Sequence, residues 1–196
     1  MSKIIYLMRH GKTVFNVLHI VQGYNSDSPL TLKARLKGRK IAHYFINNKI
    51  SFDGVFASDT LRATKTAKLV TKHKYKVIKV RNLRELKFGD LEKTHQHLTF
   101  DRLFDAPNAF KDQHGESNEE AGKRLHDTLL ELIKNKNQIL CVSSCAIILS
   151  FLKVYIPNEF LKIKKMNNFP NYSTIVLEVN DNEFKFTKLI SFKDIS

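Results

Sequence analysis

The residues with the clearest chemical potential lie near the start of the chain. The segment Met8–Thr13 follows the apolar run Ile4–Leu7 and contains Arg9 and His10 directly ahead of Gly11. An imidazole nitrogen can act as a nucleophile, and the planar guanidinium fork matches the oxygens of a phosphate. This combination suits the transfer of a phosphoryl group from an ester to a histidine nitrogen.

Such a transfer also needs further cations or donors around the phosphoryl oxygens and a proton donor for the leaving alkoxide. Arg62 lies in the first turn of a helix predicted over Thr60–Thr71, where the guanidinium and the positive helix end can both face an anion. Glu85 supplies a carboxyl group that can act as the acid. Asn16, six residues after His10, offers an amide donor.

The elements that must position these side chains alternate along the sequence. Short runs typical of strands occur at Lys3–Met8, Gly54–Ala57, Lys76–Val80 and Gln138–Val142. Helical patterns occupy Ala34–Phe45, Thr60–Thr71, a stretch that starts with the capping box Ser117–Glu120, and Ala146–Tyr155. The tail reads as two antiparallel strands, Ser173–Val179 and Glu183–Leu189.

Strands that alternate with helices predict a mainly parallel sheet covered on both faces. Ligands of such sheets bind outside the carboxyl ends of the strands. The pair Arg9–His10, Ser58 and the pair Ser143–Ser144 all follow predicted strands. We therefore expect three separate segments to meet at one rim.

The order and spacing of these motifs resemble the histidine phosphatase superfamily, the phosphoglycerate-mutase-like group. The matching segments are Leu7–Thr13 with Asn16, Gln22–Gly23, Asp27–Thr31, Ser58–Asp59, Leu61–Ala63, Thr66–Ala67, Leu83–Leu86, Phe88–Gly89, Gly115–Ser117 and Asn171. The resemblance covers nearly the whole chain. It implies a single domain over residues 1–196, folded as a three-layer α/β/α sandwich with a mainly parallel central sheet.

The resemblance also implies roles for individual residues and no metal or organic cofactor. His10 would be the phosphorylated nucleophile, Arg9 and Arg62 would lie in the phosphate pocket, and Glu85 would be the proton donor. The substrate-binding residues would be Asn16, Gly11, Gln22, Gly23, Ser58 and Ser144. The chain length favours the phosphatase branch, so we expect hydrolysis of a phosphomonoester, with mutase-type phosphoryl transfer as an alternative.

The sequence departs from the family pattern after the fourth strand. The family has a second catalytic histidine there in a Ser-His-Gly turn, whereas this chain has Ser144 and Cys145 at the last two positions. A serine hydroxyl donates one hydrogen bond without charge, and losing one preorganised donor costs about 10²–10³ in rate. Three interpretations stay open: a slow or rewired phosphatase, a catalytically silent phosphate-binding protein, and an introduced change at Ser144, against which Cys145 argues.

Cys145 has two interpretations of its own. A turn between a strand and a helix in a cationic pocket would lower the pKa of the thiol and make it a nucleophile. A packed thiol is the simpler interpretation, and it is the one we favour. The side chains that select the organic half of the ester are expected between Leu91 and Gln113.

The composition and charge of the chain indicate which kinds of partner it can have. The chain of 196 residues carries a formal net charge of +14, which fits a lysine-rich surface or the attraction of small phosphorylated substrates. The basic residues are scattered without interleaved aromatics, which disfavours nucleic acid, so the expected partner is a small phosphorylated substrate or inorganic phosphate. No apolar stretch approaches the ~20 residues that span a bilayer, and no signal-peptide pattern is present, so a cytoplasmic protein without a membrane partner is expected. The oligomeric state stays open.

Overall fold

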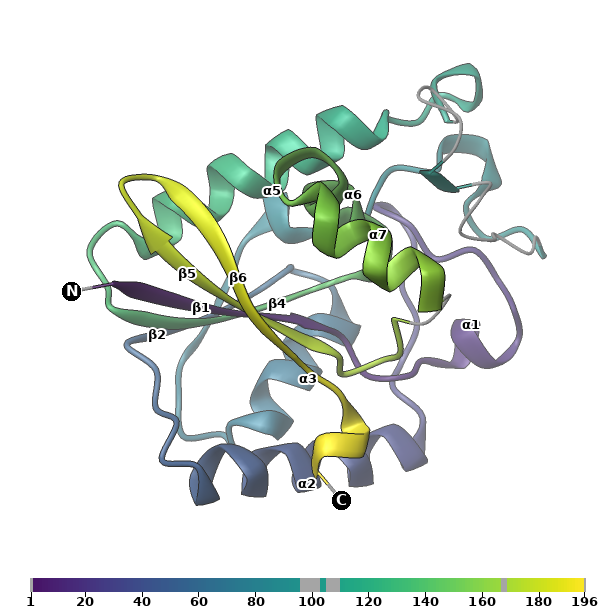
Figure 1. Cartoon of the computed structure of the whole chain (residues 1–196). Coiled ribbons are helices and arrows are strands. Elements are labelled where there is room, and N and C mark those ends of the chain that lie inside the picture. The colour runs from purple at the N-terminus through teal and green to yellow at the C-terminus, as the bar shows by residue number, and fades with distance from the viewer. Residues whose placement is uncertain (1, 96–102, 105–109, 167–168, 196) are drawn as a thin grey trace.

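The computed structural model describes residues 2–95, 103–104, 110–166 and 169–195. Its centre is one sheet with the strand order β3-β2-β4-β1-β5-β6 (Figure 1). The strands are β1 (Lys3–Arg9), β2 (Gly54–Ala57), β3 (Val77–Lys79), β4 (Gln138–Ser143), β5 (Thr174–Asn180) and β6 (Glu183–Ile190). The first four strands pair in parallel, and β5 and β6 add an antiparallel edge.

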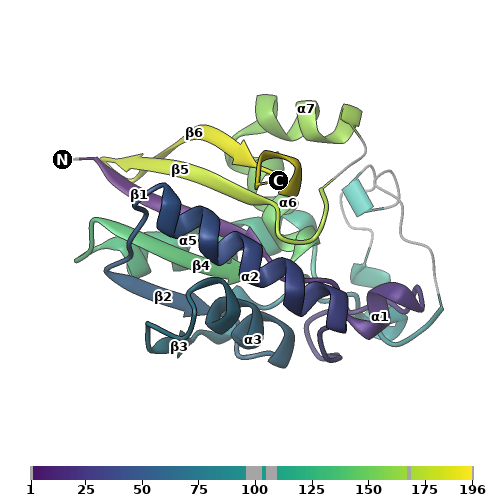
Figure 2. The same ribbon diagram turned by 90° about the horizontal axis from the view of Figure 1, so that it is seen from below.

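Helices cover both faces of this sheet. The helices α2 (Leu32–Asn47) and α3 (Leu61–Val70) lie on one face, and α5 (Asn118–Ile133), α6 (Cys145–Tyr155) and α7 (Pro157–Met166) lie on the other (Figures 1 and 2). Successive residues of a strand point to opposite faces, so β1 contributes Ile5 and Leu7 to one hydrophobic core and Tyr6 and Met8 to the other. The predicted three-layer α/β/α sandwich is confirmed.

The elements follow the sequence pattern closely. The predicted strands and the antiparallel tail are confirmed to within a residue or two at each end. The capping box at the start of α5 is also confirmed, because the Ser117 hydroxyl accepts from the Glu120 amide at 3.1 Å and the Glu120 carboxylate accepts from the Ser117 amide at 2.9 Å. Ala34 and Phe45 are buried on one side of α2, as the spacing predicted.

Two helices have no counterpart in the prediction. The first, α1 (Val14–Val17), is a single turn in which Thr13 and Asn16 cap each other. The second, α7, buries only Phe160 and Ile163 within a lysine-rich segment, so its apolar stripe is too short to stand out by periodicity. Four 3-10 turns complete the described structure: Arg81–Leu83, Gly89–Leu91, Lys111–Gln113 and Phe192–Ile195.

The parallel register brings the predicted strand ends together. Arg9 lies beside Ser143 in the pairing of β1 with β4, and Ala57 lies beside Val142 in the pairing of β2 with β4. The His10 amide continues the ladder by donating to the Ser143 carbonyl at 3.0 Å.

None of the helices in the described part of the chain is long and apolar enough to cross a membrane.

Candidate active site

His10 is the centre of the polar groups at this rim. Its side chain is buried, and its Nδ1 lies 2.8 Å from the carbonyl oxygen of Gly11. Burial, followed by the nearby Arg62 and Arg9, holds the pKa of His10 well below 6.5, so the ring is neutral at pH 7. Because a carbonyl oxygen can only accept, the single ring proton sits on Nδ1. The Nε2 atom therefore keeps its lone pair, as a nucleophilic nitrogen must.

Gly11 makes this arrangement possible through close packing. A Cβ atom at Gly11 would lie 2.5 Å from the hydroxyl oxygen of Tyr172. The Gly11 amide donates to the Thr66 hydroxyl at 3.0 Å, which ties the turn to α3. The carbonyl that orients His10 is thus held from two sides, and any larger residue at Gly11 would displace it.

A cavity of about 380 Å³ opens beside His10. Its lining residues are Arg9, His10, Lys12, Phe15, Asn16, His19, Ile20, Val21, Gln22, Glu85, Phe88, Leu103, Cys145, Ala146, Leu149 and Asn171. Five of the ten residues singled out from the sequence are among them: Arg9, His10, Asn16, Gln22 and Glu85. Gly11, Gly23, Ser58, Arg62 and Ser144 are not.

The two arginines keep one donor each without a protein acceptor. Among the described residues, the Nε atoms of Arg9 and Arg62 are buried and hydrogen-bond to no partner. Arg9 donates through NH1 to the carbonyl of Phe169, which fixes its guanidinium at the cavity wall. A buried donor without an acceptor is costly, so an anion that reaches these Nε groups would stabilise the site.

Arg62 has a second task that the sequence did not reveal. Its fully buried guanidinium donates to the carbonyls of Ser26 at 2.6 Å and Gly23 at 3.0 Å, and it pairs with Asp27 at 3.1 Å. These contacts use both terminal nitrogens, so Nε is the guanidinium nitrogen without a partner among the described residues. Arg62 lies behind the lining residues and acts on the cavity from within the protein.

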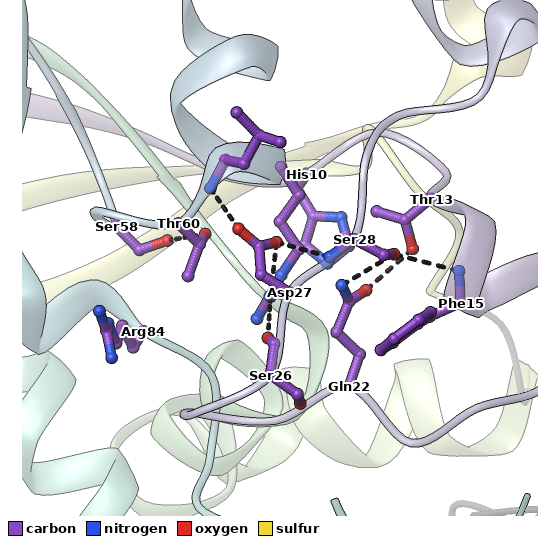
Figure 3. A network of polar contacts seen from close by, with 12 residues as sticks. His10, Thr13, Phe15, Gln22, Ser26, Asp27, Ser28, Ser58, Thr60 and Arg84 are labelled. Atoms are coloured by element: carbon purple, nitrogen blue, oxygen red, sulfur yellow. Dashed lines mark hydrogen bonds and ion pairs between the residues drawn. The ribbon is translucent and has the colours of Figure 1, made fainter. Parts of the chain in front are cut away.

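The expectation that the N-terminus of α3 faces a ligand anion is wrong. The Asp27 carboxylate occupies that place, because its Oδ2 accepts from the Leu61 amide while its Oδ1 accepts from Arg62. Figure 3 shows Asp27 between the start of α3 and the surrounding polar network. A carboxylate at this end satisfies the helix dipole, so the chain supplies the anion itself.

Among the described residues, Glu85 is the one carboxylate that lines the cavity. Its Oε1 accepts from the amides of Leu86 at 2.9 Å and Ile147 at 2.8 Å, and its Oε2 accepts from the Ala146 amide at 3.1 Å. Burial raises the pKa of Glu85 above 4.5, although these amides and Arg62 oppose the rise. Within the described residues, Oε2 accepts one hydrogen bond, which leaves it room to carry a proton.

Ser144 and Cys145 start α6 at the back of the cavity. Ser144 is the N-cap residue, but its hydroxyl makes no capping hydrogen bond and is buried without a partner among the described residues. Cys145 lines the cavity, and burial raises the pKa of its thiol to about 11 against the opposing effect of Arg9. The interpretation in which the cationic pocket lowers the pKa of Cys145 is therefore wrong, and the thiol is protonated at neutral pH.

The remaining predicted residues build the walls. The Gln22 side chain accepts from the Thr13 hydroxyl at 2.8 Å and donates to the Ser28 hydroxyl at 3.0 Å (Figure 3). Ser58 follows β2 as expected, but its hydroxyl bonds to that of Thr60 at 2.7 Å and does not reach the cavity. These hydroxyls and the amide therefore hold the loops in place.

Gly23 and Asn16 also have defined places. A Cβ atom at Gly23 would lie 2.5 Å from a carboxylate oxygen of Glu92, so a larger residue there would have to move the Glu92 side chain. The Asn16 Oδ1 accepts from the Thr13 amide at 3.2 Å and from Asn171 Nδ2 at 3.3 Å. Since that oxygen is used, the group that Asn16 can turn toward an anion is its NH₂.

Asn171 and Lys12 are polar lining residues to which the sequence analysis gave no role. Asn171 was quoted only as a motif match, and its Nδ2 donates to the His10 carbonyl at 3.0 Å. Lys12 adds a second cation beside Arg9. Of the expected substrate-selecting segment, Leu103 lines the cavity, and residues 96–102 and 105–109 lie outside the described part of the chain.

Comparison with known proteins identifies the family. The model of the histidine phosphatase superfamily (branch 1) matches residues 5–191. This chain belongs to the histidine phosphatase superfamily. Among the curated relatives, it is 37% identical over 92 residues to a probable phosphoglycerate mutase GpmB of Enterobacter sp. (strain 638), which covers 46% of this chain and 41% of the relative.

Two further proteins resemble this histidine phosphatase superfamily member. Over 69 residues it is 36% identical to the broad-specificity phosphatase YOR283W of Saccharomyces cerevisiae, which covers 35% of this chain and 30% of the relative. The chain thus spans less than half of the length of these two relatives. Its fold matches that of a phosphoserine phosphatase from Entamoeba histolytica in complex with 3-phosphoglyceric acid, with a TM-score of 0.79 and 22% identity over 99% of this chain and all of the other.

Proposed function

We propose that this protein hydrolyses small phosphomonoesters through a phosphohistidine formed on His10. The observation that carries the proposal is the fixed tautomer of His10, which is neutral, holds its proton on Nδ1 against the Gly11 carbonyl, and keeps the Nε2 lone pair. Membership of the superfamily and its phosphatase relatives support hydrolysis in general. The residue roles below are part of the proposal.

In the first step, Nε2 of His10 attacks the phosphorus. A P–N bond forms, the ester P–O bond breaks, and its electron pair leaves on the alkoxide oxygen, which takes the proton from Glu85. The Nε group of Arg9 and the NH₂ of Asn16 hold the phosphoryl oxygens, and Arg62 adds its positive charge from behind the cavity lining. Electrostatic stabilisation of those oxygens contributes most of the rate in such transfers.

In the second step, water attacks the phosphorus of phosphohistidine. Glu85, now ionised, takes the proton from the water, the P–N bond breaks, and the electron pair returns to Nε2. The raised pKa of Glu85 supports this exchange, because burial favours the protonated carboxyl group that the first step needs. Inorganic phosphate then leaves the cavity.

Ser144 limits the rate of turnover in this proposal. Its buried hydroxyl is not among the groups that line the cavity, and it brings no positive charge to the phosphoryl group or the leaving oxygen. We therefore expect turnover lower by about 10²–10³ than with a charged or better placed donor.

A phosphate-binding protein without turnover is the second candidate function. The observation that favours it is the same residue, because Ser144 lies behind the cavity lining and brings no charge to the leaving group. In this candidate, Arg9 would still bind phosphate with the charge of Arg62 behind the cavity lining, and His10 would never become phosphorylated.

Hydrolysis of p-nitrophenyl phosphate by the wild-type chain and by His10→Ala tests the two candidates. Hydrolysis that disappears in the variant supports the enzyme. Equal rates in both proteins would show that the activity does not depend on His10 and would contradict the mechanism. A parallel assay with 3-phosphoglycerate, analysed for its 2-isomer and for free phosphate, separates mutase-type transfer from hydrolysis.

A further inference from the structure

A second cavity lies directly beside the candidate active site. It has a volume of about 370 Å³ and is lined by Lys12, Thr31, Lys33, Ala34, Lys37, Pro170, Asn171 and Tyr172. Lys12 and Asn171 also line the cavity of His10. The two cavities therefore share a wall, and a charge placed in one is close to the other.

The charged residues known to line this second cavity are all positive. Three lysines line it, and no carboxylate of the described residues does. Within the described part of the chain, no Asp or Glu forms an ion pair with Lys12, Lys33 or Lys37. Lys33 and Lys37 stand one helical turn apart on α2, a spacing at which like charges destabilise a helix. The spacing of these two charges therefore does not stabilise the helix.

The frame of the second cavity is well fixed. The Thr31 amide donates to the Lys12 carbonyl at 2.9 Å, which joins the turn after His10 to the start of α2. The Tyr172 hydroxyl donates to the Ala34 carbonyl at 2.7 Å and closes the other side. Contacts between backbone groups and buried side chains therefore set the positions from which the lysines extend.

One of the lysines is also held through its own side chain. The Lys37 ammonium lies 4.5 Å from the centre of the Phe192 ring, a cation–π contact that restricts its freedom. Lys40, on the same helix, lies 6.0 Å from that ring and does not line the cavity. The helix also starts without an acidic residue in its first turn, so its dipole adds to the positive potential.

We propose that this second cavity binds a phosphate-class oxyanion next to the phosphoryl group handled by His10. The oxyanion has two possible sources with the same chemistry: a second phosphate of the substrate itself, or a separate phosphate-bearing molecule that binds beside it. The first source rests on the proposed function, whereas binding of a separate anion does not.

Calorimetric titration of the protein with inorganic phosphate tests the proposal and does not require the protein to be active. The wild-type chain is expected to bind two phosphates. The double variant Lys33→Gln/Lys37→Gln should weaken one of the two sites by about tenfold or more, because charge-assisted contacts are lost. The control Arg39→Gln/Lys40→Gln removes the same charge from exposed positions of α2 outside the cavity, and both sites should persist.

A second experiment identifies the source of the anion. It measures how tightly a sugar bisphosphate and the matching monophosphate bind when they displace phosphate. Binding of the bisphosphate at least tenfold tighter, lost only in Lys33→Gln/Lys37→Gln, supports the substrate's own second phosphate. Equal binding of the two esters alongside two phosphate sites supports a separate anion. A single phosphate site in the wild type, or equal effects of the two double variants, overturns the proposal.

These outcomes are independent of the proposed function. A protein that hydrolyses nothing still gives a phosphate isotherm, so loss of turnover and loss of the second site are read separately. Circular dichroism of both double variants checks that they fold, which we expect because all four residues are exposed.

Discussion

Replacing Arg62 by methionine removes the group that holds the loop behind the cavity. The guanidinium is fully buried and satisfies the carbonyls of Ser26 and Gly23. Each buried acceptor left without a donor costs about 1–3 kcal/mol. The Asp27 carboxylate is 30% exposed and can turn to water, so its loss adds little.

Part of this loss of stability is offset, because the methionine variant no longer buries a charge. Burial is the main cause that lowers the pKa of Arg62, so desolvation of the guanidinium destabilises the folded wild type. Methionine also keeps most of the apolar contacts of the arginine stem. We therefore expect Arg62→Met to lower the free energy of unfolding by about 2–4 kcal/mol.

Urea unfolding followed by far-ultraviolet circular dichroism measures this loss, since the chain has no tryptophan to serve as a fluorescent probe. Arg35→Met, on the exposed side of α2, is the matched control and should change the free energy by less than about 0.5 kcal/mol. A loss below about 1 kcal/mol in Arg62→Met would refute the reasoning. Added phosphate should raise the midpoint of the wild type more than that of Arg62→Met, because binding to the folded state alone stabilises it.

Further predictions concern the chemistry of the cavity. Ser144→His should raise the turnover of p-nitrophenyl phosphate by about tenfold or more. No gain would indicate that another group already serves the leaving oxygen, or that Cys145 alters the turn. The rate should fall as the pH drops through the pKa of His10, which lies below 6.5, because the protonated ring has no lone pair. It should also fall as the pH rises through the pKa of Glu85, which lies above 4.5, because the carboxyl group then has no proton to give. In Glu85→Gln that alkaline fall should be absent and kcat lower, and a pH profile identical to that of the wild type would assign the proton transfer elsewhere.

Much of the architecture follows from local patterns in the sequence. The alternation of apolar strands with helical stripes determines a parallel sheet with two covered faces, and the Ser117–Glu120 capping box marks the start of α5. The strand ends then place Arg9, His10 and Ser144 at one rim without further information. The helix α7 could not be predicted in this way, because two buried residues in a lysine-rich segment do not form a recognisable helical periodicity.

The pairing of polar groups at the site does not follow from residue types. The sequence suggests that Arg62 and the start of α3 face a ligand, whereas Asp27, 35 residues from Arg62, pairs with one terminal nitrogen of Arg62 and accepts from the first amide of α3. The tautomer of His10 depends on the direction of the Gly11 carbonyl, which tertiary packing against Tyr172 sets. Such contacts join segments distant in the chain, and a single sequence carries no signal for them.

The most direct test of the central proposal is to look for the phosphoryl group on His10 itself. The protein is mixed with p-nitrophenyl phosphate, stopped rapidly in alkali, digested and analysed by mass spectrometry, with His10→Ala as the control. We expect an acid-labile phosphoryl group on the peptide that contains His10 in the wild type, and none in the variant. Turnover without phosphorylation of His10, or phosphorylation at another residue, would contradict the proposed mechanism.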